Sequence, residues 1–157
     1  MAALGSDITH RSLVSKGVDG KSPISMIVIN AAIAYRGAFC THDTTTGEVK
    51  PYDGTVTDRA VGWHFQDAVT GNSAAPRNTA RIITGGYQAK RAVTGLVTTV
   101  TTDYGKKVYA SNDNDLTLTG TTATMHVGFV VANSEGTTAG TNAWVAFRDM
   151  FGKVGGQ

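Results

Sequence analysis

The chain has 157 residues, a length that suits one domain with a substantial core and is short for two. Its 14 Lys and Arg against 12 Asp and Glu leave a formal net charge of +2, too small a surplus for a dedicated nucleic-acid or membrane-surface binder. A protein partner is therefore expected. Cys40 is the only cysteine, which excludes an intrachain disulfide and a Cys-rich zinc site, and we expect it to be a small buried side chain.

Residues 1–23 are expected to form an extended N-terminal arm, because charged and turn residues are scattered among isolated apolar ones. The arm would contact the partner through four apolar side chains and one cation: Leu4, Ile8, Leu13, Val14 and Arg11. A frayed terminus without a role is the alternative. The stretch lacks the pattern of a secretory signal, and no apolar run reaches the roughly 20 residues of a spanning helix. We expect a soluble protein made in the cytoplasm, with no membrane partner.

A β domain is expected over residues 24–148, followed by a flexible tail at 149–157. The 19 glycines and the paired threonines favour strands and turns. β-Branched residues predict a strand at 24–30, and a short strand follows at 48–52. Beyond these a half-buried strand is predicted with His64 on its polar side, because apolar and other residues alternate there: Val61, Trp63 and Phe65 with Gly62, His64 and Gln66.

The second half of the chain also predicts short strands separated by loops and turns. A loop at 68–80 precedes predicted strands at 80–84 and 91–102, and a last strand is predicted at 142–148. Between them, the segment 104–131 (YGKKVYASNDNDLTLTGTTATMHVGFVV) reads as three short strands separated by polar turns. About nine strands result, with the spacing of an all-β antiparallel sandwich or barrel.

The two halves share a weak internal similarity. Gly37 corresponds to Gly105, a polar turn follows each, and the four residues at 60–63 (AVGW) correspond to those at 126–129 (HVGF). The halves would then be similar β-meanders packed face to face. Chance matching of short glycine-based segments is the alternative.

Motifs for catalysis or cofactor binding are missing from the sequence. The four histidines are far apart and show no metal-ligand spacing, and there is no nucleotide-binding or nucleophile motif. The aspartates fall mostly in turns, where Asp usually bonds its own backbone; those weighed as paired carboxylates are Asp43, Asp53, Asp58, Asp67, Asp103, Asp113 and Asp115. We therefore expect no enzyme, no cofactor and no metal site.

A basic stretch lies between Asp67 and Asp103, where no acidic residue occurs. It holds Arg77, Arg81, Lys90 and Arg91. The three arginines are the candidates for docking on an acidic protein surface, since a guanidinium suits bidentate contacts with carboxylates. A solvated face that only aids solubility is the alternative.

The segment 104–131, with its Val108-Tyr109, Leu116-Thr117 and Val127-Gly128 pairs, followed by NAWVAF at 142–147, resembles the head decoration (capsid cement) proteins of tailed phages. The resemblance spans roughly Ile24 to Arg148. It implies a small β protein, a homotrimer, that binds the outer surface of an expanded head and clamps neighbouring major capsid subunits of the HK97-like fold. Its site would be the virion surface, its synthesis in the host cytoplasm, and neither nucleic acid nor membrane would be a partner.

Two other functions are compatible with the composition. A tail-tube or head-fibre subunit could share the Thr- and Gly-rich strands and would form rings or polymers. A carbohydrate-binding β-sandwich on the virion would use exposed aromatic side chains for stacking, for which Trp63, Trp144 and Tyr87 are the candidates. Both tryptophans also lie in predicted strands, and a place in the core is the alternative for them.

Overall fold

The fold comes from a computed structural model that describes residues 23–55, 57–96, 103–131, 142–148 and 150. This part of the chain is all-β, as predicted, and contains twelve strands where about nine were expected. The arm before Pro23 and all but Met150 of the tail lie outside the described residues. The strands are β1 (Ile24–Ile27), β2 (Ile33–Ala34), β3 (Phe39–His42), β4 (Val49–Pro51), β5 (Arg59–His64), β6 (Val69–Thr70), β7 (Thr79–Ile83), β8 (Tyr87–Thr94), β9 (Lys107–Ala110), β10 (Leu116–Thr117), β11 (Met125–Val131) and β12 (Asn142–Phe147).

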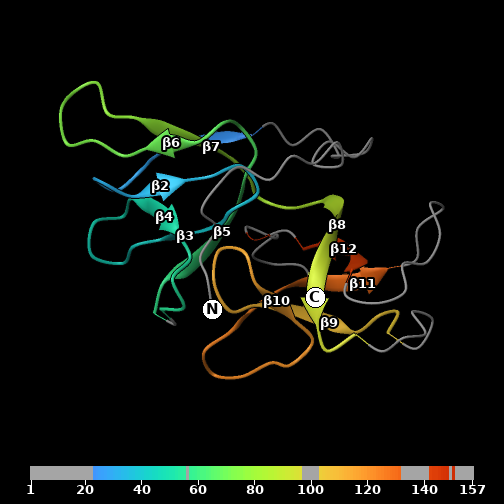
Figure 1. The fold of residues 1–157 in the computed structure, drawn as a ribbon. Coiled ribbons are helices and arrows are strands. Elements are labelled where there is room, and N and C mark those ends of the chain that lie inside the picture. Colours follow the sequence, from blue (N-terminus) through green and yellow to red (C-terminus); the bar gives the residue numbers. More distant parts are fainter. Residues whose placement is uncertain (1–22, 56, 97–102, 132–141, 149, 151–157) are drawn as a thin grey trace, which may run out of the picture.

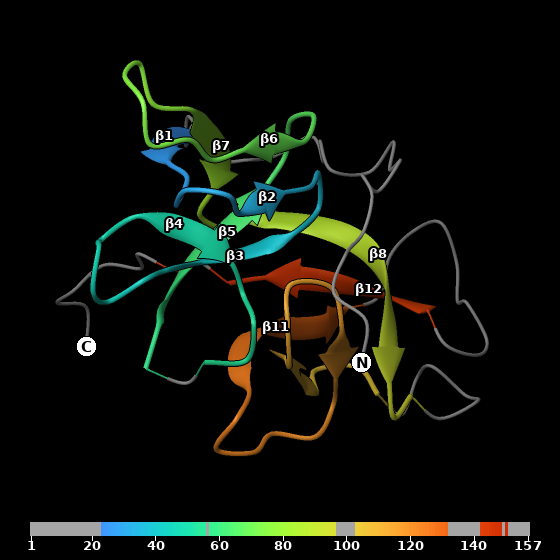
Figure 2. The same cartoon turned by 60° about the vertical axis from the view of Figure 1, so that its left-hand side comes forward.

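The strands form two units that follow each other along the chain (Figure 1). The N-terminal unit is a five-stranded sheet in the order β1-β7-β5-β3-β4, and a two-stranded ribbon of β2 and β6 is added to it. The C-terminal unit is a closed barrel of β10, β8, β12, β11 and β9. Figure 2 shows the N-terminal unit above the C-terminal unit.

The strand pairing confirms that the two units repeat one topology. β1, β3, β4, β5 and β7 of the N-terminal unit occupy the places of β8, β9, β10, β11 and β12. The register agrees residue by residue: Ile24 faces Ile82 as Ala89 faces Val145, and His42 faces Val49 as Ala110 faces Leu116. The parallel contact that closes the barrel, Leu116 with Val93, has its counterpart in a parallel bridge between Val49 and Val28.

Each unit contains one β-bulge at the residues that first indicated the repeat. Cys40 faces Gly62 while Thr41 faces Ala60, so Val61 is the extra residue, and Val127 is extra in β11 in the same way. The glycine that follows each bulge lies against the neighbouring strand. A Cβ atom at Gly62 would be 2.1 Å from the carbonyl oxygen of Ile83, and one at Gly128 would be 2.2 Å from that of Ala146. The repeated Val-Gly pair is therefore a packing requirement.

The bulge also explains an incorrect prediction. Because an extra residue shifts the alternation, Val61 joins the core of the N-terminal unit while Trp63 points to the other side. His64, expected on a solvated face, is fully buried. Its two ring nitrogens lie 3.1 Å from the carbonyl oxygen of Arg81 and 2.9 Å from that of Asp67, so the ring links β5 to β7 and to the turn after β5.

Equivalent positions fill the interiors of the two units. Buried pairs at matching places are Val28 and Val93, Cys40 and Val108, Val49 and Leu116, Val61 and Val127, Ala80 and Ala143, and Ile82 and Val145. Cys40 is buried as expected, and burial raises the pKa of its thiol to about 12. Apart from Leu116, these side chains are small or β-branched and suit a narrow interior.

Candidate docking surfaces

The two units of the chain pack against each other through a well-defined apolar contact. Phe39, Trp63 and Ile83 point away from the core of their own unit and belong to the hydrophobic cluster of the C-terminal unit. The ring centroids of Trp63 and Phe147 are 4.4 Å apart, and the backbone N–H of Phe39 donates to the carbonyl oxygen of Asp113 at 2.8 Å. One face of the N-terminal unit therefore covers the C-terminal barrel.

Arg91 lies inside this contact, which corrects its assignment to an exposed docking patch. Its side chain is buried, and its guanidinium carbon lies 5.1 Å from the centre of the Trp63 ring. Its Nη1 donates to the carbonyl oxygen of Gly37 at 3.1 Å, and Nη2 donates to that of Asn114 at 3.2 Å. Arg91 therefore joins the two units, and a docking partner cannot reach it in this structure.

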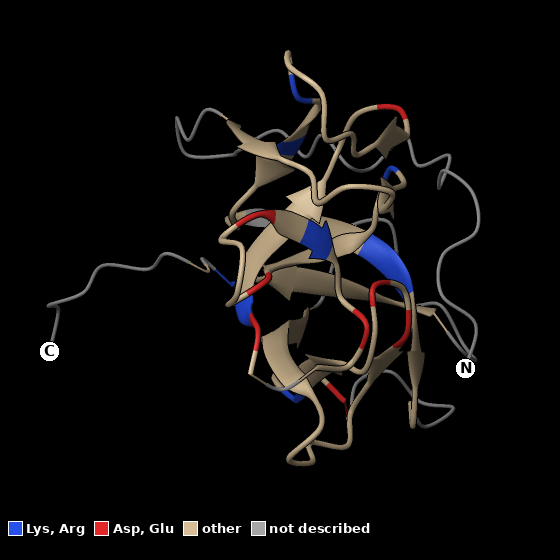
Figure 3. Ribbon diagram, turned by 90° about the vertical axis from the view of Figure 1, so that its left-hand side faces the viewer, with Lys and Arg blue, Asp and Glu red and all other residues tan. Residues whose placement is uncertain are grey.

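The other two predicted arginines, Arg77 and Arg81, belong to the N-terminal unit. Arg77 forms an ion pair with Glu48, and Arg81 lies on β7 with its guanidinium carbon 5.9 Å from the Phe65 ring. Figure 3 shows Lys and Arg spread over several elements of the described chain. The predicted arm residues Leu4, Ile8, Arg11, Leu13 and Val14 lie outside the described residues.

Three of the aspartates that the sequence placed in turns are brought together around one lysine. The Nζ atom of Lys50 lies 3.0 Å from Asp53, 3.1 Å from Asp58 and 3.7 Å from Asp43. Backbone N–H groups of Thr46 and Thr45 hold the pKa of the Asp43 carboxyl below its usual range. Turn capping and Lys50 thus account for these carboxylates, and the turn interpretation is confirmed for Asp43 and Asp53.

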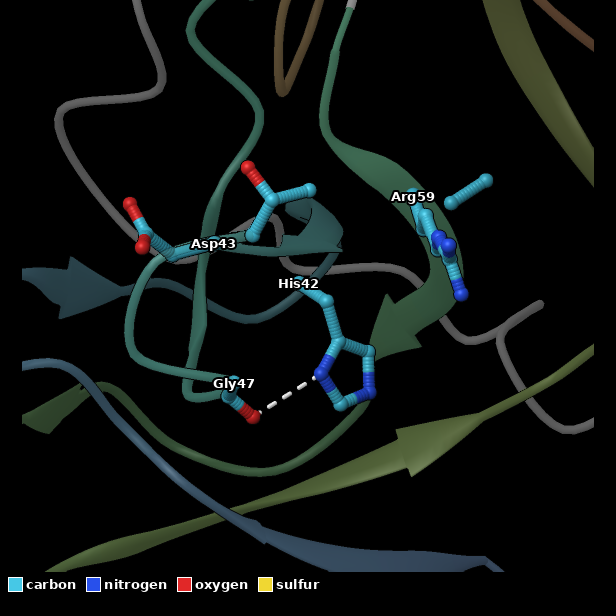
Figure 4. Close-up of a pocket in the computed structure, with 6 residues that line it drawn as sticks. His42, Asp43, Gly47 and Arg59 are labelled. Atoms are coloured by element: carbon cyan, nitrogen blue, oxygen red, sulfur yellow. Dashed lines mark hydrogen bonds between the residues drawn. The ribbon is translucent and has the colours of Figure 1, made fainter.

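A shallow hollow of about 400 Å³ lies beside this cluster, lined by His42, Asp43, Thr44, Gly47, Arg59 and Ala60. Figure 4 shows the imidazole of His42 turned toward the Gly47 carbonyl, with Nδ1 2.9 Å from that oxygen. Asp43 uses Oδ1 to accept hydrogen bonds from its own turn. His42 and Asp43 therefore stabilise the β3–β4 turn. Among the described residues, no group of three or more His, Cys, Asp or Glu could hold a metal ion.

Large apolar side chains that remain exposed fall on both units. In the described ranges these are Ile24, Ile27, Ile33, Tyr104 and Phe129. Phe129 is 38% exposed and packs edge-on against His126, with ring centroids 4.9 Å apart. Partial burial, helped by the positive charges of Arg148 and Lys107, lowers the pKa of His126. The ring lies between Arg148 and the Gly128 carbonyl, contacts that suit neutral imidazole with its proton on Nε2.

The aromatic residues proposed for glycan stacking are placed differently. Trp63 is fully buried between the units, and Trp144 is 9% exposed on β12. Both tryptophans are core residues, while the side chain of Tyr87 is outside what the structure describes. Two of the three candidates are therefore withdrawn as a stacking platform.

Comparisons with known proteins give no relative. No family model matches the chain, no curated protein matches it, and no solved structure matches its fold. In the described part of the chain, no helix is long and apolar enough to span a membrane.

Proposed function

We propose that the protein is a structural virion component, a decoration protein that binds the outside of an expanded tailed-phage head and stabilises contacts between major capsid subunits. The observation that carries the proposal is the resemblance of the segment 104–131 to head decoration proteins of tailed phages. Strands β9, β10 and β11 of this segment lie in the closed barrel. Polar side chains around Lys50 and in the neighbouring hollow form turns and ion pairs. Large apolar side chains are exposed on both units. This distribution supports a role in contacts between proteins.

The mechanism would be mechanical. A protein that binds only the expanded lattice stabilises that lattice by mass action, because every bound copy lowers the free energy of the expanded state. Many weakly bound copies on a symmetric shell act together, so each contact can be small. The major capsid protein with the HK97-like fold would be the partner, and a homotrimer the soluble form.

Binding to shells tests the proposal. A major capsid protein from the same genome as this chain would be assembled into shells, and the purified chain would be sedimented with expanded and with unexpanded shells. We expect saturable binding to expanded shells only, and a higher temperature of shell opening. Equal binding to both forms, or to neither, would contradict the proposal.

Variants locate the docking surface. Charge reversal at Arg77 and Arg81 should weaken binding to expanded shells without unfolding the chain, because partly exposed charges govern encounter more than stability. Deleting residues 1–22 should lower occupancy and leave the melting transition of the β domain nearly unchanged. If both variants bind as wild type, the docking surface lies elsewhere on the β domain.

A tail-tube or head-fibre subunit is the second candidate. The observation that favours it is the tandem repeat of one β topology in the chain, since stacked equivalent contacts suit rings and polymers. Electron microscopy of the purified protein separates the two functions. Long tubes or fibres would support the second candidate, and small closed particles the first.

A further inference from the structure

The contact between the units has two sides, and each side has an equivalent elsewhere in the molecule. On one side is the face around Trp63, and on the other is the part of β8 that carries Ala89 and Arg91. The repeat places Phe129 at the position of Trp63, because Phe129 pairs with Lys107 as Trp63 pairs with Phe39. It places Ile24 at the position of Ala89.

These equivalent positions differ in burial. Trp63 and Ala89 are fully buried and belong to one hydrophobic cluster, whereas Phe129 is 38% and Ile24 37% exposed. Strand β11, which carries Phe129, and strand β1, which carries Ile24, lie in opposite parts of the molecule in both Figure 1 and Figure 2. One molecule therefore cannot bring its own two surfaces together, but two molecules can.

We propose that a second copy of this chain covers these surfaces, with Phe129 of one copy docked against Ile24 of the next. The chain itself indicates this occupant, because the equivalent of each surface is already covered by a unit of the same fold. The contact joins two different surfaces and is therefore heterologous, so it generates a closed ring or an open chain. A closed ring of three would be one such arrangement.

The contact between copies is weaker than the contact between units. Lys107 stands at the position of Phe39, and Met26 at that of Arg91, so an aromatic ring and a cation with two carbonyl partners are missing. The N-terminal unit also carries the β2–β6 ribbon, whose Ala34 packs into the core cluster that Met26 borders. The copies therefore associate reversibly, while the two units stay together.

Disulfide trapping of single-cysteine variants tests the contact. Ile24→Cys and Phe129→Cys would be purified separately and mixed at micromolar concentration under mild oxidation. The native Cys40 is buried with a pKa of about 12, so it stays unreactive. We expect crosslinked dimers in the mixture and little crosslinking in either variant alone. A disulfide needs Cα atoms within about 7 Å of each other, and the proposed contact brings Phe129 of one copy to Ile24 of another, not two copies of the same residue together. The double variant should give a ladder or a closed ring.

A matched control uses the other face of the same strand. Ile27 is about as exposed as Ile24, but its side chain lies on the opposite face of β1, because the two residues are three apart on one strand. Ile27→Cys should therefore not crosslink to Phe129→Cys. Crosslinking of Phe129→Cys with itself would show a two-fold contact and overturn the proposal, as would absence of crosslinks in the mixture or equal crosslinking through Ile27. Because no shells are present, failure here leaves the proposed binding to phage heads untouched.

Discussion

The two units share a topology, a bulge and the character of six core positions, yet their outer faces have different roles. In the N-terminal unit the face around Trp63 is buried against the other unit, and in the C-terminal unit the same face carries exposed Phe129 and Lys107. The interior of each unit is thus set by its strand pairing, and small or β-branched side chains fill it at every matching position except Leu116. The outer face is free to differ, and its side chains decide what each unit binds.

The largest difference is expected at the equivalent aromatic positions. Trp63→Ala should lower the free energy of unfolding by about 3–5 kcal/mol, because it leaves a cavity in a fully buried contact. Phe129→Ala should cost about 1 kcal/mol or less, since its ring is already partly in solvent. Urea unfolding of the two variants measures both values. Similar losses would contradict the assignment of one face as buried and the other as exposed.

A second comparison concerns the glycines after the bulges. Gly62→Ala should cost about 1–3 kcal/mol or more, because its Cβ would overlap the Ile83 carbonyl and its φ of 153° is unfavourable for alanine. Gly128→Ala meets a similar obstacle at Ala146. Gly47→Ala is the control, because no atom lies within 4 Å of its Cβ and only the positive φ matters. Thermal melting should rank Gly47→Ala as the mildest; an equal effect at all three would contradict the close approach of the strands.

Arg91 and Arg77 provide a third comparison. Arg91→Met, which copies the residue at the equivalent position of the other unit, should destabilise the chain by about 1–3 kcal/mol, because two carbonyl oxygens lose their donor. Arg77→Met should change stability little, since its ion pair with Glu48 is partly exposed. Chemical denaturation measures the difference. A stable Arg91→Met variant with impaired shell binding would restore Arg91 to the docking surface.

The smallest effect on stability is expected from protonation of Asp43 at acidic pH. The pKa of Asp43 is lowered by the backbone N–H groups of Thr46 and Thr45, so the folded state favours the ionised form. Its contribution to stability is therefore complete above the ordinary value of 3.8 and is lost as pH falls through the lower folded pKa. Asp43→Asn should remove this part of the pH dependence between neutral pH and pH 3. An unchanged pH profile of the melting temperature would show that the turn does not depend on the charge.

The sequence was sufficient for the all-β fold class and only indicated the repeat, through the Val-Gly pairs that mark the two bulges. It did not reveal the ribbon, since β2 and β6 have two residues each and such strands show no period. The phase shift at Val61 placed His64 on the wrong face. The burial of Arg91 depends on carbonyl groups 54 and 23 residues away, which no local pattern indicates. Asp43 and Asp53 were predicted correctly as turn residues, but their meeting with Asp58 at Lys50 comes from the tertiary fold.

Hydroxyl-radical footprinting across a range of protein concentrations tests most directly that equivalent faces are covered, one within the chain and one between chains. The oxidation rates of Trp63, Phe129 and Ile24 would be followed by mass spectrometry from nanomolar to high micromolar concentration. We expect Trp63 to be protected throughout, and Phe129 and Ile24 to be reactive in dilute solution and to become protected together as concentration rises. Reactivity of Phe129 and Ile24 that does not change with concentration, or protection of only one of them, would contradict the account.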